Sequence, residues 1–247
     1  MLEPSLWLAS AQRLCVLTGA GVSAESGIPT FRGPGGLWRQ YKPEELATPQ
    51  AFRRDPNLVW EWYDWRRQLI AKAEPNPAHR ALVELEKRAP KFTLITQNVD
   101  GLHRRAGSRN IIHVHGDIWL VRCTVCGRQD QNEIVPLPEI PPHCSGCGGL
   151  LRPGVVWFGE SLPAQEWEAA TRAARQCDLF LVIGTSAAVM PAGGLAMDAR
   201  SAGARVIEIN AEETGLSRYV DVSLRGPAGE LLPALLKEGI PNSDRLL

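Results

Sequence analysis

The stretch Leu14-Cys-Val-Leu-Thr-Gly-Ala-Gly-Val-Ser-Ala24 decides the fold. Its first four residues form an apolar run with the length and composition of a buried strand. Gly19, Gly21 and Ala24 then satisfy the pattern G-x-G-x-x-G/A, in which glycines let backbone amides approach a pyrophosphate at a helix N-terminus. The stretch therefore predicts a strand, a phosphate-binding loop and a helix, which together open a dinucleotide-binding domain.

The residues that follow do not fit a hydride-transferring dehydrogenase. Such an enzyme continues with a full helix, a second strand and an acidic residue about 20 positions on. Here Gly27-Ile-Pro-Thr-Phe-Arg-Gly-Pro-Gly-Gly36 interrupts both the helix and the strand. This composition predicts a loop that folds over the ligand.

Further apolar runs rich in branched residues lie at 92–95, 111–114, 179–183 and 206–209. Their continuous apolarity is typical of a parallel sheet that is covered on both faces. Helix-like stretches separate them, at 76–87, 164–176 and 193–202, and a short amphipathic helix is expected within residues 1–10. Strands that alternate with helices predict an α/β fold with a Rossmann-like, doubly wound parallel sheet.

Two segments interrupt this alternation. The first begins at Phe31, is rich in tryptophan and arginine, and contains a helix that Asp55 is expected to cap and Pro56 to begin. The second, around 123–147, is rich in proline, glycine and cysteine. We therefore expect a small helical and zinc-ribbon domain inserted into the large one. The expected large domain comprises residues 1–30, 86–116 and 154–247, and the small one residues 31–85 and 117–153.

Four cysteines form two pairs, Cys123-x-x-Cys126 and Cys144-x-x-Cys147, which enclose 17 residues. This is the spacing of a zinc ribbon, and four thiolates close a tetrahedral shell with no position left for water. The predicted zinc is therefore structural, although the adjacent His143 could replace one ligand. Disulfides are typical of small secreted chains instead. The remaining cysteines, Cys15 and Cys177, lie in or beside apolar runs and are expected to be buried.

Composition excludes several classes of protein. Lysine plus arginine and aspartate plus glutamate both number 27, so no net field attracts nucleic acid or an acidic membrane. The apolar runs are far shorter than the roughly 20 residues of a membrane helix. Glu3 and Pro4 stand where a signal peptide carries positive charge and an apolar run. We expect a soluble, cytoplasmic protein with no membrane or nucleic-acid partner.

Two further blocks, Thr96-Gln-Asn-Val-Asp-Gly-Leu-His103 and His113-Val-His-Gly-Asp117, make the pattern specific. Together with the glycine loop, Gly27-Ile-Pro-Thr-Phe-Arg32 and the four cysteines, they resemble the sirtuin family of NAD-dependent protein deacylases. The resemblance spans nearly the whole chain, with the motifs in family order. It implies NAD as co-substrate, one structural zinc ion, and acylated lysine side chains of proteins as substrate.

The resemblance also implies roles for individual residues. His115 is the implied general base, although His113 would share its face if the strand continued, so residue physics alone does not separate the two. The implied NAD contacts are Gly19, Ala20, Gly21, Ser23, Ala24, Glu25, Ile28, Pro29, Phe31, Arg32, Trp38, Gln97, Asn98, Asp100, Gly184, Thr185, Ser186, Asn210, Ala211, Glu212 and Ala228. The implied peptide-binding segment, which would pair with substrate by strand addition, is Val155, Val156, Trp157, Phe158, Gly159 and Glu160.

The mechanism of the sirtuin family explains why a histidine is expected at the site. The acyl-lysine amide oxygen attacks the ribose carbon that bears nicotinamide, and nicotinamide leaves. A base then activates a ribose hydroxyl, and a histidine with an ordinary pKa of about 6.5 is mostly neutral near pH 7 and accepts that proton. Water resolves the intermediate to free lysine and an acylated ADP-ribose.

The helix that begins at Pro56 bears on the choice of acyl group. Leu58, Trp62, Trp65 and Leu69 are expected to form its apolar stripe, with Tyr63, Arg66 and Arg67 beside it. These polar residues could be a solvated basic face, or tyrosine and arginine could clamp a carboxylate. Helical spacing does not choose between the two arginines. The pattern Tyr63-x-x-Arg66, with Thr30 in place of a frequent aspartate, resembles the sirtuin branch that removes succinyl and malonyl groups.

Four alternatives stay open at this stage. One is a deacetylase without preference for acidic acyl groups, and another is a protein ADP-ribosyltransferase. A third is an NAD-dependent dehydrogenase, which would show an absorbance change of reduced nicotinamide. The last is a zinc-ribbon nucleic-acid binder, against which the acidic Asp130, Glu133 and Glu139 in the ribbon speak.

Overall fold

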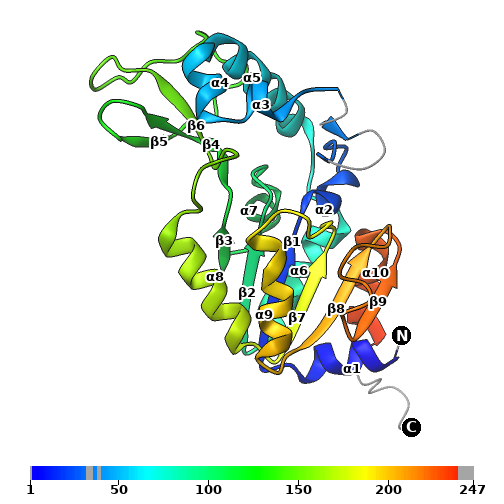
Figure 1. Cartoon of the computed structure of the whole chain (residues 1–247). Helices are drawn as coiled ribbons and strands as arrows, with labels where there is room; N and C mark the ends of the chain where they lie inside the picture. The colour runs from blue at the N-terminus through cyan, green and yellow to red at the C-terminus, as the bar shows by residue number, and fades with distance from the viewer. Residues whose placement is uncertain (1, 32–35, 38–39, 239–247) are drawn as a thin grey trace.

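The computed structural model describes residues 2–31, 36–37 and 40–238. Arg32 and Trp38, both predicted NAD contacts, lie outside these residues. Two units are visible in Figure 1, one around a six-stranded sheet and a smaller one around a three-stranded sheet.

The large unit is built on a parallel sheet in the order β3-β2-β1-β7-β8-β9. Its strands are β1 (Arg13–Thr18), β2 (Lys91–Thr96), β3 (Ile111–His113), β7 (Leu179–Ile183), β8 (Arg205–Asn210) and β9 (Val222–Arg225). The order of the strands reverses between β1 and β7. In an open parallel sheet, ligands bind outside the carboxyl ends of the strands at such a reversal.

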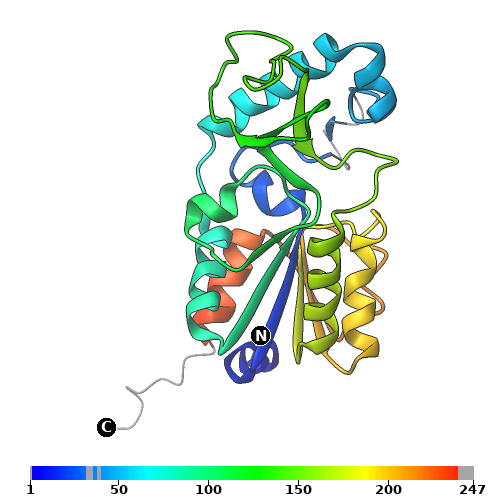
Figure 2. The same cartoon turned by 90° about the vertical axis from the view of Figure 1, so that its left-hand side faces the viewer.

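Helices cover both faces of this sheet (Figures 1 and 2). One face packs against α1 (Leu2–Ser10), α6 (Pro77–Arg88) and α10 (Ala228–Glu238). The other packs against α8 (Ala164–Gln176) and α9 (Leu195–Ser201), which follows the short turn η2 (Ala192–Gly194). Two short helices, α2 (Ala20–Ala24) and α7 (Leu102–Ala106), follow the phosphate-loop and β2 segments. The doubly wound fold expected from the sequence is confirmed, and Cys15 and Cys177 are buried, as expected.

The small unit combines three helices with an antiparallel sheet in the order β5-β4-β6. Its elements are α3 (Pro43–Leu46), α4 (Pro49–Arg54), α5 (Pro56–Lys72), β4 (Gly116–Cys123), β5 (Gln129–Gln131) and β6 (Leu151–Val155). The fully buried Trp60 of α5 donates from Nε1 to the carbonyl of Leu151, at 2.8 Å, and so joins the helices to the sheet. Asp55 caps α5 as predicted, because its Oδ1 accepts from the Leu58 amide at 3.0 Å.

The expected domain boundaries differ from the structure at two places. Residue 85 lies inside α6, and the buried side of this helix, including Leu82 and Leu85, packs into the core of the large sheet. The chain therefore enters the large unit before Pro77, because one amphipathic helix cannot divide its apolar face between two cores. The second boundary, between Pro153 and Gly154, falls within β6.

Among the described residues, no helix is long and apolar enough to cross a membrane.

Candidate active site

A cavity of about 900 Å³ lies at the carboxyl ends of the central strands and is lined by both units. Gly19 follows β1, Gln97 follows β2, Gly184 follows β7, and Asn210 ends β8. The small unit contributes side chains of α5 and the segment 155–160, which continues from the end of β6. The cavity therefore occupies the place where the reversal of strand order predicts a ligand.

Glycines form the floor of this cavity because two loops cross there in close contact. The Gly21 amide donates to the carbonyl of Gly184 at 2.7 Å. A Cβ atom on Gly21 would lie 2.7 Å from that carbonyl oxygen, and one on Gly19 would lie 2.6 Å from Cβ of Thr185. Gly184 itself has a φ of +59°, which disfavours any side chain. The glycines predicted to approach a phosphate are thus also required for the two loops to approach each other.

A chain of polar contacts lies beneath the floor of the cavity. Asn98 donates from Nδ2 to the carbonyl of Gly19 at 3.0 Å and to Ser23 Oγ at 3.2 Å. Ser23 in turn donates to Asp100 Oδ2 at 2.8 Å, and Asp100 Oδ1 accepts from the Leu102 amide. Burial raises the pKa of Asp100, and these two hydrogen bonds oppose that shift. The chain fixes the first glycine of the loop relative to β2.

A second chain joins the carboxyl ends of three strands. Gln97 donates from Nε2 to Thr185 Oγ1 at 2.9 Å, and Asn210 donates from Nδ2 to the carbonyl of Thr185 at 3.0 Å. The loops that follow β2, β7 and β8 are therefore held together at the cavity rim.

His115 lines the cavity, whereas His113 ends β3 and is not among its lining residues. The Nδ1 atom of His115 lies 3.2 Å from the carbonyl oxygen of Gln97. Because a carbonyl only accepts, Nδ1 carries the proton, and the lone pair of the neutral ring is on Nε2. Burial lowers the pKa of His115, so its ring is neutral near pH 7.

The end of the cavity in the small unit is formed by aromatic rings around a buried guanidinium. Arg66 has 6% exposure, and its Cζ lies 4.7 Å from the ring centre of Phe31 and 4.9 Å from that of Trp62. Tyr63 lies beside it, and its hydroxyl accepts from Trp157 Nε1 at 2.9 Å. Burial raises the pKa of Tyr63, which keeps the hydroxyl protonated. Of the carboxylates that the structure describes, none forms an ion pair with Arg66.

The next residue, Arg67, points elsewhere. It is fully buried and donates to the carbonyl of Asn132, to Asn132 Oδ1 at 2.7 Å and to the carbonyl of Ile134 at 3.3 Å. It therefore ties α5 to the loop after β5. The structure chooses between the two arginines: Arg66 faces the cavity, and Arg67 braces the fold.

The expected apolar stripe of α5 is confirmed for Trp62 but not for its other members, and the alternative of a solvated basic face is wrong. Leu58 and Trp65 are exposed, and the buried side of the helix includes Val59, Trp60 and Ile70 together with both arginines. The error arises because arginine and tryptophan side chains are both amphipathic. Their positions in the sequence therefore do not show which side of the helix is buried.

Glu160 is engaged within the protein. Arg152 Nη2 donates to its Oε2 at 2.9 Å, and the Trp157 amide donates to the same oxygen at 2.8 Å. The Arg152 guanidinium also lies 3.6 Å from the centre of the Trp157 ring. Glu160 thus fixes the turn of the segment 155–160.

Most predicted site residues meet at the cavity. Those that line it are Gly19, Ala20, Gly21, Ala24, Glu25, Phe31, Tyr63, Arg66, Gln97, Asn98, His115, Val155 to Glu160, Gly184, Thr185, Ser186, Asn210, Ala211, Glu212 and Ala228. Four predicted positions do not line it: Ser23, Ile28, Pro29 and Asp100. Sequence reasoning assigned no role to further lining residues, which are Ala47, Trp62, Val99, Leu162, Val189, Met190, Ile209, Glu213, Thr214, Gly215, Gly226 and Pro227. Five of these twelve directly adjoin a predicted residue in the chain, and for them that adjacency was the available signal.

The four paired cysteines form a compact cluster in which all sulfur atoms lie within 4.8 Å of one another. Cys123 and Cys147 Sγ atoms are 3.5 Å apart, and those of Cys126 and Cys144 are 3.8 Å apart. Four sulfurs at about 2.3 Å from one zinc would be spaced by roughly 3.8 Å, so the cluster fits a tetrahedral structural site. His143 is not part of the cluster, and its Nδ1 lies 3.3 Å from Glu139 Oε1.

Comparisons with known proteins agree on one family. A model described as "Sir2 family" matches residues 19–191. An "NAD-dependent protein deacylase" of Aquifex aeolicus is 58% identical over 215 residues, which are 87% of this chain and 90% of that protein. A solved Sir2 homologue–NAD complex matches with a TM-score of 0.90 and 51% identity, over 95% of this chain and 92% of that one. A Sir2–p53 peptide–NAD+ complex matches with a TM-score of 0.87 and 30% identity, over 97% and 98%.

Proposed function

Because this chain belongs to the Sir2 family of NAD-dependent protein deacylases, we propose that it removes succinyl and malonyl groups, as well as acetyl groups, from lysine side chains. The observation that carries the choice of acyl group is Arg66, a buried guanidinium that lines the cavity without an ion-pair partner among the described carboxylates. The products are nicotinamide, free lysine and O-acyl-ADP-ribose.

NAD supplies a ribose carbon whose bond to nicotinamide breaks as the acyl-lysine amide oxygen attacks. The protein's part is to hold the reactants and move a proton. One continuous lining is formed by the glycine loop, by the hydrogen-bonded residues Gln97, Thr185 and Asn210, and by Ala228 at the start of α10. This lining suits an extended dinucleotide. Asp100 and Ser23 act from behind this lining, because they orient Asn98 and Gly19.

His115 is the proposed general base. Its Nδ1 proton is held by the carbonyl of Gln97, a residue of the same lining, so the basic Nε2 is fixed relative to the proposed ribose site. Nε2 would accept the proton of a ribose hydroxyl, which then attacks the former amide carbon. A well-placed base contributes about 10²- to 10⁴-fold to the rate of such a step.

Arg66 and Tyr63 form the proposed carboxylate clamp. A buried cation without a counterion is unfavourable, and a succinyl or malonyl carboxylate would neutralise it. The guanidinium presents several N–H donors in one plane, which match the two oxygens of a carboxylate. The rings of Phe31 and Trp62 hold this plane by contact with its face, so its edge is available to the ligand.

The segment 155–160 is the proposed peptide-binding strand, and four of its amides are already engaged. The Val156 amide donates to the carbonyl of His115 at 2.9 Å, and the Phe158 amide to that of Ala47 at 3.0 Å. The amides of Trp157 and Glu160 also donate within the segment. A substrate strand would therefore donate its own amides to carbonyls of this segment, which allows many peptide sequences.

The experiment that tests this function incubates the protein with NAD and three matched peptides that carry acetyl-, succinyl- or malonyl-lysine. Mass spectrometry identifies the products. We expect nicotinamide and O-acyl-ADP-ribose from all three, with a lower KM for the two acidic peptides. Absence of these products would refute the deacylase, ADP-ribose attached to protein would indicate a transferase, and equal KM values would refute the clamp.

A further inference from the structure

The segment between β8 and β9, residues 211–221, begins two strands along the sheet from β1 and contributes one wall of the cavity. Residues 210–215 all line the cavity there, and Ala228 and its two preceding residues complete the wall. Under the proposed function, this end receives the adenosine of NAD. This segment forms neither a helix nor a strand, and side-chain contacts join it to the sheet.

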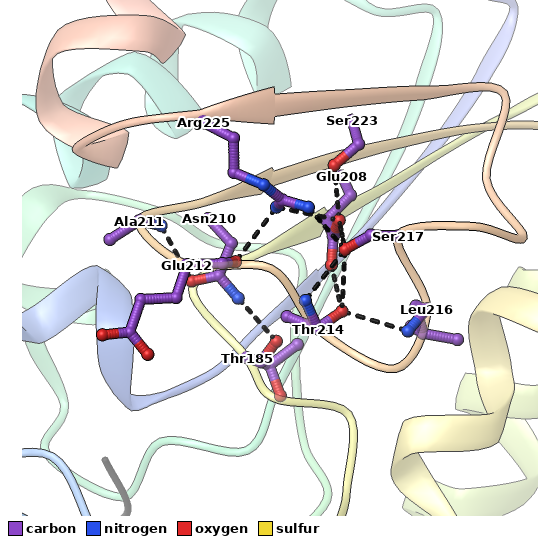
Figure 3. A network of polar contacts seen from close by, with 10 residues as sticks. All are labelled: Thr185, Glu208, Asn210, Ala211, Glu212, Thr214, Leu216, Ser217, Ser223 and Arg225. Carbon is purple, nitrogen blue, oxygen red and sulfur yellow. Dashed lines mark hydrogen bonds and ion pairs between the residues drawn. The ribbon is translucent and has the colours of Figure 1, made fainter. Parts of the chain in front are cut away.

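Glu208 of β8 is the centre of the contacts that hold this segment (Figure 3). Its side chain is fully buried, and its carboxylate accepts from the Thr214 hydroxyl, from Ser217 Oγ at 2.6 Å and from Ser223 Oγ at 2.6 Å. Arg225 Nη1 adds a fourth donor at 3.2 Å. A buried carboxylate needs such partners, and four donors offset the cost of its removal from water.

The donors come from two different places in the chain. Ser223 and Arg225 belong to β9, which pairs directly with β8, and in that register Glu208 faces Ser223. Thr214 and Ser217 belong to the segment itself. The carboxylate therefore joins a rigid sheet to a segment that has no regular structure.

Arg225 strengthens this connection from the other side. Its Nη2 donates to Ser217 Oγ at 2.6 Å, and its Nη1 donates to the carbonyl of Glu212 at 3.0 Å. Glu212 lines the cavity. Figure 3 shows the Arg225 guanidinium and Ser217 on opposite sides of the Glu208 carboxylate, with Asn210 anchored separately to Thr185.

Burial raises the pKa of Glu208, but the hydrogen bonds from Ser217, Ser223, Thr214 and Arg225 outweigh burial and lower its pKa overall. The carboxylate is therefore ionised near neutral pH, and each of its hydrogen bonds is charge-assisted. This makes the contacts stronger than those of a neutral amide at the same position.

We infer that Glu208 is a positioning residue for the adenosine end of the NAD site, and that it acts through Thr214, Ser217 and Arg225 rather than by contact with NAD. The inference rests on the proposed function. Glu208 is not among the cavity-lining residues, whereas Thr214 and Glu212 are. Its loss releases the wall of the adenosine end and leaves His115, at the other end of the lining, in place.

The two serines provide a matched pair for the test. Ser217 and Ser223 donate to the same oxygen, Oε2 of Glu208, at the same distance of 2.6 Å, but only Ser217 belongs to the segment. We would compare Ser217→Ala, Ser223→Ala and Glu208→Gln with the unmodified protein. Calorimetry gives the Kd of ADP-ribose, steady-state kinetics gives KM for NAD and kcat, and thermal unfolding gives Tm.

Glu208→Gln is expected to raise the Kd of ADP-ribose and KM for NAD about tenfold, and Ser217→Ala about fivefold, with kcat changed less than twofold. Ser223→Ala is expected to leave both constants within about twofold, although it removes a comparable hydrogen bond. Equal effects of the two serine variants, or a fall in kcat and Tm without a change in Kd, would overturn the inference. If the unmodified protein binds neither NAD nor ADP-ribose, the proposed function fails instead.

Discussion

Two arginines near opposite ends of the cavity are in opposite electrostatic states. Behind the proposed adenosine end, Arg225 is paired with the buried carboxylate of Glu208. At the acyl end, Arg66 lies among aromatic rings, and no carboxylate of the described chain forms an ion pair with it. The first arginine holds a wall of the site in place, and the second is left with unused binding capacity.

The presence or absence of a counterion thus distinguishes a structural arginine from one that binds a ligand. A buried charge that is already neutralised contributes to the fold, and its partner shows which segment it secures. A buried charge without a counterion is unfavourable on its own, so its retention at a cavity indicates a ligand of opposite charge. Arg67 is also structural, although its acceptors are uncharged, because it donates to the backbone and side-chain oxygens of Asn132 in the loop that it braces and does not line the cavity.

Removal of zinc should have the largest effect, because it should stop deacylation while ADP-ribose binding persists. The cysteine cluster closes the ribbon of the small unit, and α5 is joined to that unit by Trp60 and Arg67. Structural zinc contributes about 10–16 kcal/mol in small zinc modules, which exceeds the stability of most domains. We expect a strong chelator to abolish deacylation completely, while calorimetry still detects ADP-ribose binding within about tenfold of the untreated Kd. Loss of both would show that the adenosine end depends on the small unit.

Substitution of His115 should affect both kinds of acyl substrate equally. His115 lines the cavity, and the proposed proton transfer is the same for every acyl group. His115→Ala is expected to lower kcat at least 100-fold with succinyl- and acetyl-lysine peptides alike. Product formation measured by mass spectrometry would check this. Turnover that persists in the variant would remove His115 as the base, and His113→Ala serves as the control for a nearby histidine.

Arg66→Met should reduce activity on the succinyl peptide far more than activity on the acetyl peptide. Loss of a hydrogen bond between charged groups costs about 1.5–3 kcal/mol, which corresponds to roughly 10- to 150-fold in affinity. We expect kcat/KM for the succinyl peptide to fall by that factor, mainly through KM, while the acetyl peptide changes less than about threefold.

The adjacent Arg67→Met is the matched control. It should lower the melting temperature, because it removes the nitrogen that donates to three acceptors in the loop after β5, but it should leave the succinyl-to-acetyl ratio unchanged. If Arg66→Met reduced both activities equally, the carboxylate clamp would be refuted.

The pH dependence should show the smallest effect. Burial lowers the pKa of His115 below the ordinary value of about 6.5. Protonated histidine cannot accept a proton, so kcat/KM falls as the pH falls, but the lowered pKa moves this fall to a pH below 6.5. A rate profile from pH 5 to 8 should therefore be nearly flat above pH 7 and identical in shape for both acyl groups. A midpoint above 6.5 would contradict this environment of His115.

Local patterns were sufficient for the large sheet. The strands predicted around residues 14, 92, 111, 179 and 206 all exist, because buried parallel strands are continuous apolar runs that few other structures produce. Strand β9 was not predicted, because Ser223 and Arg225 interrupt its apolarity. Those residues are polar because they serve the Glu208 carboxylate, a partner that comes from the neighbouring strand.

The pairing of the four cysteines and the glycine loop after the first strand could be predicted from the amino-acid sequence alone, since each depends on short spacings. Only the tertiary structure decided which arginine faces the cavity. Arg66 and Arg67 are chemically identical and differ by roughly 100° around one helix. The rotation of α5 is fixed by the burial of Trp60 against the small sheet, a contact 91 residues apart in the chain. Partners distant in sequence also decide that α6 belongs to the large unit. Burial and pairing are properties of the packed molecule, and no local pattern contains them.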